Sequence, residues 1–85
     1  MTDYRFAVDV MPRDGILDPQ GRAVEASLPH VGAGAAAVSD VRVGRRVELT
    51  VQADSEDGAR EFVEQLAADF LANPLVEQWS IEAMG

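Results

Sequence analysis

The stretch from Val38 to Gln52 decides the fold and reads Val-Ser-Asp-Val-Arg-Val-Gly-Arg-Arg-Val-Glu-Leu-Thr-Val-Gln. Apolar and polar residues alternate through it with a period of two, which is typical of a β-strand with one buried face. The apolar side of this alternation consists of Val41, Val43, Val47, Leu49 and Val51. Arg45 is the one charged residue within that row. The sequence therefore predicts a long strand with an apolar side and a polar side.

Gly44 interrupts this strand and leaves two conformations open. The chain either continues as one strand that bends at Gly44, or it turns back there as a β-hairpin. A two-residue loop at Gly44-Arg45 would set Val43 opposite Arg46 on one face, which the alternation disfavours. A three-residue loop over residues 44–46 would keep the valines together. We favour the bent strand.

The length of that strand predicts self-association. A single strand over residues 38–52 would be about 50 Å long, well beyond the usual length of a strand. A chain of 85 residues has few other strands that could pair with both halves of such a long strand. We therefore expect a homodimer or a larger homo-oligomer.

The composition excludes several classes of protein. Fifteen acidic residues against seven basic ones give a net charge of −8, which repels nucleic-acid phosphates and anionic lipids. The absence of cysteine and the presence of a single histidine exclude thiolate and histidine-rich metal sites. The N-terminal residues do not resemble a signal peptide, and no apolar run is long enough to cross a bilayer. We expect a cytoplasmic protein that binds neither nucleic acid nor membrane.

The residues before this stretch predict a strand and a short helix. Residues 4–11 alternate like residues 38–52 and predict the first strand. Asp18-Pro19 predicts a helix start, since Asp is a favourable N-cap and Pro suits the first helical position. Pro29 ends that helix, and its residues expected to face the core are Ala23, Val24 and Leu28. Residues 29–37 are predicted as a loop, in which His30 is solvated rather than catalytic.

The residues after it predict a longer helix and a last strand. Residues 54–57, Asp-Ser-Glu-Asp, supply an N-cap and acids for a first helical turn. Apolar residues then recur at the spacing of one buried helical stripe: Ala59, Phe62, Val63, Leu66, Ala67, Phe70 and Leu71. Asn73-Pro74 ends this helix. The alternation of Trp79, Ile81 and Ala83 predicts the final strand.

The order strand, helix, long strand, helix, strand predicts an α+β fold. We expect a two-layer sandwich with both helices on one face of a largely antiparallel sheet, formed by residues 1–85 as a single domain. The opposite face would carry charges of both signs, from Arg5, Asp9, Asp40, Arg42, Arg46, Glu48 and Glu82. No enzyme motif is present: the sequence has no phosphate-binding glycine loop, nucleophile elbow or histidine-carboxylate metal set.

Three motifs follow one another along nearly the whole chain: Ile16-Leu17-Asp18-Pro19-Gln20-Gly21, Val41-Arg42-Val43-Gly44-Arg45 with Glu48-Leu49, and Leu71-Ala72-Asn73-Pro74-Leu75-Val76-Glu77. In this order and spacing they resemble the PurS family, the small subunits of phosphoribosylformylglycinamidine (FGAM) synthase. The resemblance implies a non-catalytic assembly subunit of an ATP- and glutamine-dependent ligase in de novo purine biosynthesis. It also implies that this subunit is inactive alone and carries no catalytic, cofactor or metal site.

The resemblance further implies the partners of the chain. A large synthetase subunit would bind ATP, Mg²⁺ and formylglycinamide ribonucleotide, and a glutaminase subunit would release ammonia. The small subunit, as a dimer, would bridge the two for ammonia transfer. Two other classes of function remain alternatives: a small dimeric ligand-sensing regulatory α+β domain, and a small isomerase or lyase in a similar sandwich.

We predict the interface residues from the motifs: Asp18, Gln20, Arg42, Gly44, Arg45, Asn73 and Glu77. Arg45 has two interpretations. It pairs with an acid of its own sheet, namely Asp40, Glu48 or Glu82, or it leaves the core at Gly44 and meets a carboxylate or bound anion at an interface. For Arg46 we favour pairing across strands.

Overall fold

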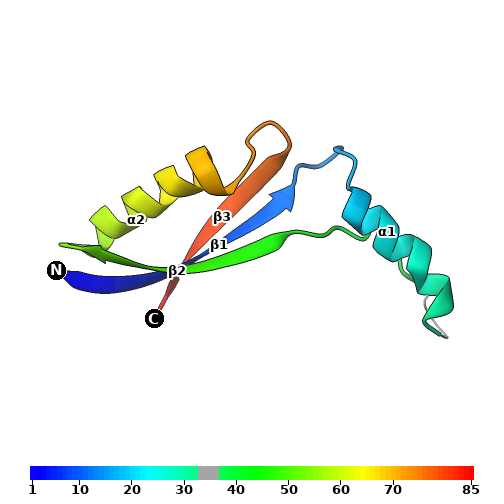
Figure 1. Ribbon diagram of the computed structural model, residues 1–85, viewed down its shortest axis with the longest axis horizontal. Coiled ribbons are helices and arrows are strands. Elements are labelled where there is room, and N and C mark those ends of the chain that lie inside the picture. Colours follow the sequence, from blue (N-terminus) through cyan, green and yellow to red (C-terminus); the bar gives the residue numbers. More distant parts are fainter. Residues whose placement is uncertain (33–36) are drawn as a thin grey trace.

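The computed structural model describes residues 1–32 and 37–85 of the chain. Within these residues, strands, helices and short helical turns follow one another as shown in Figure 1. They are β1 (Thr2–Pro12), α1 (Pro19–Ser27), the 3-10 turn η1 (Leu28–His30), β2 (Arg45–Ala53), α2 (Glu56–Leu66), the π-helical turn η3 (Ala67–Leu71) and β3 (Glu77–Met84). The predicted α+β class and element order are confirmed. The loop predicted over residues 29–37 begins with η1, and residues 33–36 lie outside the described residues.

The three strands form one antiparallel sheet in the order β2-β1-β3. In the central strand, Val8 pairs with Val47 on one side and with Ile81 on the other. Because directly opposed residues point to the same face of a sheet, the apolar residues of the three strands come together on one face. The predicted first and last strands are therefore confirmed, as is the alternation from Arg45 onward.

Residues 38–52 run in one direction and form no hairpin (Figure 1). The favoured interpretation gives the direction of the chain correctly, but the predicted 15-residue strand is wrong, because β2 begins only at Arg45. Before that residue, the backbone N–H groups of Val41 and Val43 donate to the side chains of Glu25 in α1 and of its N-cap Asp18 instead of to a neighbouring strand. At Gly44 the chain passes so close to the carbonyl oxygen of Val10 that a Cβ would not fit.

The core lies between the apolar face of the sheet and α2, which covers that face (Figure 1). Its fully buried residues are Phe6, Val8 and Val10 from β1, together with Ala59, Val63 and Ala67 from the second helix and its π turn. Ser55 caps α2, since its hydroxyl accepts a hydrogen bond from the Gly58 N–H at 3.0 Å. In the described part of the chain, no helix has the length and apolar character needed to span a membrane.

Two aromatic residues of the predicted stripe lie outside the core. Phe62 is 56% exposed and Phe70 is 78% exposed, while Leu66 is half-buried. The π turn η3 contributes to this difference, because the Ala72 N–H bonds to the Ala67 carbonyl five residues earlier, at 3.0 Å. A turn of this kind changes the phase of the helix, so Leu71 rather than Phe70 packs against the core.

Both helices were predicted to lie on one face of the sheet. This is wrong for α1, which extends beyond the end of the sheet (Figure 1). Ala23 and Val24, which were expected to face the core, are exposed, and Leu28 is only half-buried. The chain measures 52 × 27 × 13 Å, with a radius of gyration of 16.8 Å. A compact domain of this length has a radius of gyration of about 12 Å. The extended position of α1 therefore leaves apolar surface that residues 1–32 and 37–85 do not cover.

The face of the sheet opposite α2 carries ion pairs across strands. Arg46 pairs across strands with Asp9 of β1 at 3.2 Å and with Glu82 of β3 at 3.5 Å, and within β2 with Glu48 at 3.1 Å. The pairing across strands predicted for Arg46 is therefore present, with Glu82 as one of the expected acids and Asp9 as an additional one. Asp40 and Arg42, which were also assigned to this face, lie outside the sheet because β2 starts after them.

Candidate functional site

The carboxylate of Asp18 joins α1 to the segment that enters β2. Its Oδ1 accepts a hydrogen bond from the Gly21 N–H at 3.0 Å, which caps the helix, and its Oδ2 accepts one from the Val43 N–H at 2.8 Å. The hydrogen bonds from Gly21 and Val43 lower the pKa of this carboxyl below its usual value, because they stabilise its charged form. A single side chain therefore starts the helix and fixes it to the extended chain before Gly44.

Two further residues hold α1 against the same segment. Glu25 accepts a hydrogen bond from the Val41 N–H at 2.8 Å, and Gly21 is buried where an added Cβ would collide with the Val41 carbonyl oxygen. Glu25 was not among the predicted site residues. A signal for it exists, because Asp18, Gly21 and Glu25 follow one another at i, i+3 and i+7, which is the spacing of one helix side.

A second group of contacts joins the start of β2 to the start of β3. The Arg45 guanidinium donates to both carboxylate oxygens of Glu77, at 2.7 and 3.0 Å, and to the Leu71 carbonyl at 2.5 Å. The Asn73 N–H also donates to Glu77, at 2.7 Å. The hydrogen bonds from Arg45 and Asn73 lower the pKa of Glu77 to about 2, and Glu77 in turn raises the pKa of Arg45. Both side chains are therefore charged at neutral pH.

The contacts of Arg45 match neither of its two interpretations completely. Arg45 pairs with none of the three acids considered for pairing within its sheet, and it does leave the apolar row to meet a carboxylate. That carboxylate, on Glu77, belongs to the same chain. The guanidinium is half exposed beside it, so its outer edge stays open to solvent.

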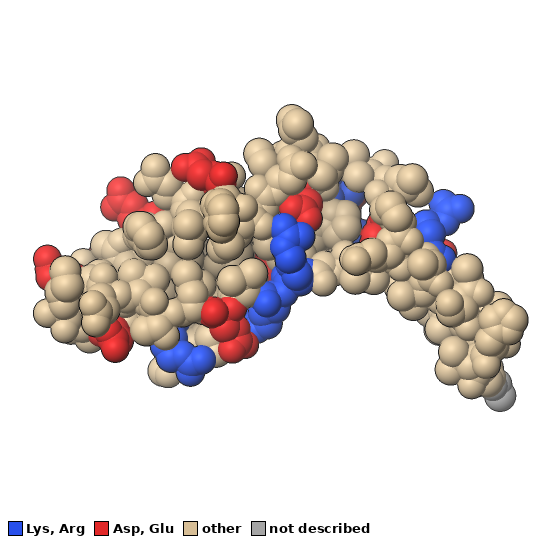
Figure 2. All heavy atoms as spheres, viewed as in Figure 1, with Lys and Arg blue, Asp and Glu red and all other residues tan. Residues whose placement is uncertain are grey.

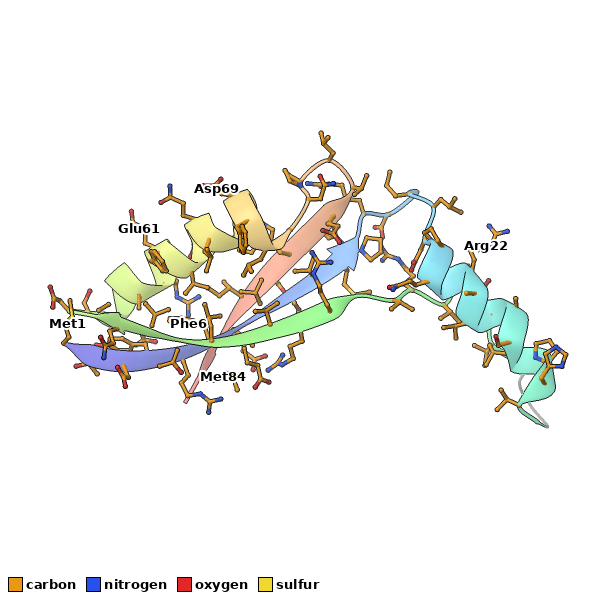
Figure 3. All side chains as sticks on the ribbon, in the orientation of Figure 1. Met1, Phe6, Arg22, Glu61, Asp69 and Met84 are labelled. Carbon is orange, nitrogen blue, oxygen red and sulfur yellow. The ribbon has the colours of Figure 1, made fainter. Side chains whose placement is uncertain are left out.

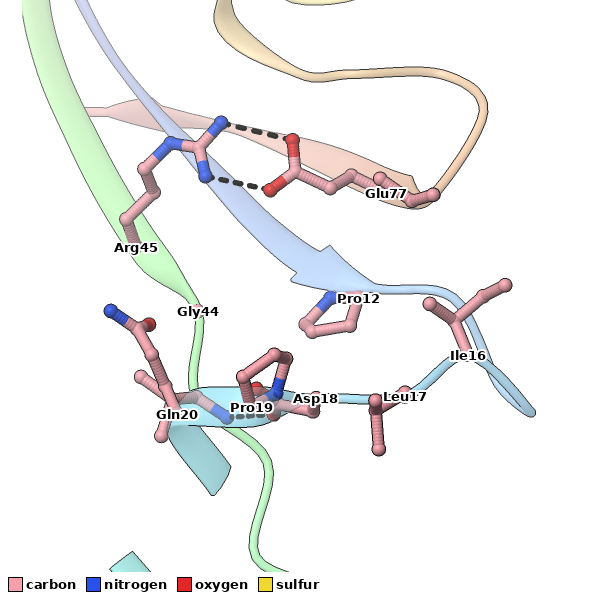
Figure 4. Close-up of a pocket in the computed structure, with 11 residues that line it drawn as sticks. Pro12, Ile16, Leu17, Asp18, Pro19, Gln20, Gly44, Arg45 and Glu77 are labelled. Carbon is pink, nitrogen blue, oxygen red and sulfur yellow. Dashed lines mark hydrogen bonds and ion pairs between the residues drawn. The ribbon is translucent and has the colours of Figure 1, made fainter. Parts of the chain in front are cut away.

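The two groups of contacts border one pocket, which we call the junction pocket (Figure 4). It has a volume of about 610 Å³ and is lined by Pro12, Ile16, Leu17, Asp18, Pro19, Gln20, Val43, Gly44, Arg45, Val76 and Glu77. Apolar side chains provide most of its wall, and Leu17 remains 67% exposed at its edge. An open apolar surface bordered by polar groups is typical of a protein-binding site.

Most of the predicted interface residues meet at this pocket. Of the predicted residues, five line the pocket: Asp18, Gln20, Gly44, Arg45 and Glu77. Asn73 adjoins it through its hydrogen bond to Glu77. Arg42 does not line it and instead pairs with Asp14 at 3.1 Å. The apolar wall was not among the residues predicted for the interface. The motif Ile16-Leu17 could have indicated it, since two adjacent large apolar residues precede a helix cap there.

The charged groups of the junction pocket, Asp18, Arg45 and Glu77, are already hydrogen-bonded within the chain, which suits binding better than acid-base chemistry. Asp18 is occupied as a cap, and Glu77 is held as an anion by Arg45. Across residues 1–32 and 37–85, no group of three histidine or acidic side chains is placed to hold a metal ion. His30 is exposed in η1 and does not line the junction pocket.

Known proteins share this sequence over most of its length. A family model described as PurS, phosphoribosylformylglycinamidine (FGAM) synthase, matches residues 5–85. The chain is 39% identical over 77 residues to the PurS subunit of phosphoribosylformylglycinamidine synthase from Mycobacterium leprae, which covers 91% of each chain. It is 30% identical over 81 residues to the PurS subunit from Thermotoga maritima, covering 95% of this chain and 96% of the relative.

Solved structures share the fold. A chain in the structure of PurLQS from Thermotoga maritima is 30% identical and superimposes with a TM-score of 0.87, over 99% of this chain and 100% of the other. The Bacillus subtilis PurS structure is 31% identical, with a TM-score of 0.80 over 96% of this chain and 99% of the other. Each of the three sequence motifs that carry the resemblance contributes residues to the junction pocket.

Proposed function

The chain belongs to the PurS family, and on this premise we propose that it is the small, non-catalytic subunit of an FGAM synthase in de novo purine biosynthesis. The observation that carries this proposal is the family match over residues 5–85. The convergence of the family motifs on the junction pocket supports it, because a shared binding surface is what an assembly subunit requires.

The partners in this proposal are a large synthetase subunit and a glutaminase subunit. The synthetase would bind ATP and Mg²⁺, and the glutaminase would supply ammonia, so this chain needs no cofactor of its own. Its role is to bridge the two subunits so that ammonia passes between them without loss to water. The elongated shape supports a bridge, since a chain 52 Å long presents well-separated surfaces to two different proteins.

We further propose that residues 1–85 act as one domain and that two copies associate, in the cytoplasm, before or during assembly. The exposed side chains of Ile16 and Leu17 at the junction pocket support self-association, because a second copy would cover them. The outer edges of β2 and β3 support it as well, since each belongs to an edge strand in the described part of the sheet.

Reconstitution tests the proposed function. The synthetase and glutaminase subunits of the same organism are purified and assayed for glutamine-dependent formation of FGAM with and without this chain. We expect product only when the chain is present, and we expect the chain alone to hydrolyse neither ATP nor glutamine. Full activity without the chain would overturn the proposal, as would sustained turnover by the chain alone. Saturable binding of an amino acid or a nucleotide to the isolated chain, measured by calorimetry, would favour the ligand-sensing alternative.

A further inference from the structure

A strip of apolar side chains runs along the second helix, away from the core. It consists of Phe62, Leu66 and Phe70, and we call it the outer strip. The two phenylalanines are 56% and 78% exposed, and no described part of the chain covers them. Beside them, a shallow hollow of about 170 Å³ lies between Phe62, Gln65, Leu66 and Asp69. Since Ala59, Val63 and Ala67 already fill the core side of the helix, the outer strip is available to another molecule.

The residue types of the outer strip suit a protein interface. Exposed aromatic side chains are enriched at the centres of such interfaces, where they fill pockets of the partner. The three residues are spaced at i, i+4 and i+8, which is the spacing by which a helix presents anchors to a groove. The π turn η3 keeps Phe70 out of the core, so the strip continues beyond the end of α2.

The charges beside the outer strip have one sign. Residues 56–71 contain one arginine and the acids Glu56, Asp57, Glu61, Glu64 and Asp69. The arginine, Arg60, turns toward the sheet, with its guanidinium 5.6 Å from the centre of the Phe6 ring. Figure 3 shows Glu61 and Asp69 pointing away from the sheet, and Figure 2 shows acidic side chains over this part of the surface. A molecule that covers the outer strip therefore meets negative charge at its border.

We propose that the outer strip binds an apolar groove bordered by lysine or arginine on a protein other than this chain. The identity of that protein rests on the proposed function, which makes it a surface of the synthetase or the glutaminase subunit. A second copy fits less well, because a symmetric contact through this strip would bring the acids that border it in one copy against the same set of acids in the other. Nucleic acids and anionic membranes are repelled by the same acids.

Binding measurements on defined variants test this inference. The variants are Phe62→Ser combined with Phe70→Ser, Asp69→Lys, and the matched control Val31→Ser, which changes an exposed apolar residue beyond α1. Each is titrated calorimetrically against the purified synthetase subunit and against the purified glutaminase subunit, at low and at high salt. We expect the double variant to bind one of the two subunits about tenfold more weakly or worse. Asp69→Lys should weaken binding to that same subunit at low salt and reduce its salt dependence, whereas the control should bind like the natural chain.

The possible outcomes separate this inference from the proposed function. If the double variant keeps its circular dichroism spectrum and binds both subunits as the natural chain does, the outer strip is not the interface, while the proposed function stands. If instead it loses self-association, measured as a lower mass in light scattering, then a second copy covers the strip and the inference is wrong. If the natural chain binds neither subunit, the proposed function and this inference both fall.

Discussion

The guanidinium of Arg45 and the carboxylate of Glu77 form a bidentate pair at 2.7 and 3.0 Å, across 32 positions of sequence. Arg45 opens β2 and Glu77 opens β3, so the pair connects the two outer strands of the sheet at one end. Since Arg45 also binds the Leu71 carbonyl, the end of the helical segment is tied to the same point.

The pair makes stability depend on pH in a defined direction. Glu77 has a pKa of about 2 in the folded chain, against a usual value of 4.5, so it stabilises the fold fully above about pH 4.5. This stabilisation is lost as the pH falls toward 2. We expect urea unfolding to show a larger loss of stability between about pH 7 and about pH 3 for the natural chain than for Glu77→Gln. Equal losses would mean that the pair does not hold in solution.

The close approach at Gly21 predicts that even one methyl group is costly there. A Cβ at Gly21 would collide with the Val41 carbonyl oxygen, so Gly21→Ala should lower the free energy of unfolding by about 1–3 kcal/mol. Gly58→Ala is the matched control, because the nearest atom to its added Cβ is the Ser55 hydroxyl, at 3.2 Å. Alanine favours helices, so this control should change stability by less than about 1 kcal/mol. Equal effects in chemical denaturation would contradict the observed contact of α1 with Val41.

Truncation on the two sides of the second helix should change the free energy of unfolding by different amounts. Val63 is fully buried, so Val63→Ala should lower the free energy of unfolding by about 2 kcal/mol. Phe70 is 78% exposed, so Phe70→Ala should change it by no more than about 0.5 kcal/mol. Thermal and urea unfolding of the two variants measure the difference. A larger loss for Phe70→Ala would show that the helix is rotated relative to the sheet.

The junction pocket predicts where self-association can be disrupted. Leu17→Glu places a charge at the edge of the pocket, where the natural side chain is largely exposed, so it should weaken the homodimer without unfolding the chain. Phe70→Glu is the control, since the outer strip is proposed to meet a different protein. Light scattering at micromolar concentration compares the masses. A monomeric natural chain would disprove the homodimer, and an unchanged mass for Leu17→Glu would place its interface elsewhere.

The alternation of residue types predicted that three strands exist, but not that β2 begins only at Arg45. The cap Asp18 was predicted from its side-chain chemistry and forms the expected hydrogen bond, and the cap predicted within residues 54–57 is Ser55. The register between strands was not specified by any local pattern. It follows from pairs such as Val8 with Val47, which depend on the whole sheet.

The positions of the helices were predicted less well, for a physical reason. Phe62, Leu66 and Phe70 repeat with the same spacing as Ala59, Val63 and Ala67, so periodicity alone does not tell which row meets the sheet. Both rows are apolar, and only one can face the core. In α1, the apolar residue Val24 predicted a helix packed on the sheet. The helix is instead held through the polar groups of Asp18 and Glu25. The partner of Arg45 was missed because the starts of β2 and β3 lie at the same end of the sheet, an arrangement that no local pattern specifies.

The double use of Asp18 has a consequence for how the molecule opens. The amide protons of Gly21 and Val43 are held by the two oxygens of one carboxylate, although they belong to a helix and to the extended chain before β2. Displacement of that carboxylate frees both amides at once. Their hydrogen-exchange rates should therefore rise and fall together, and α1 and the extended segment should unfold locally as one cooperative unit.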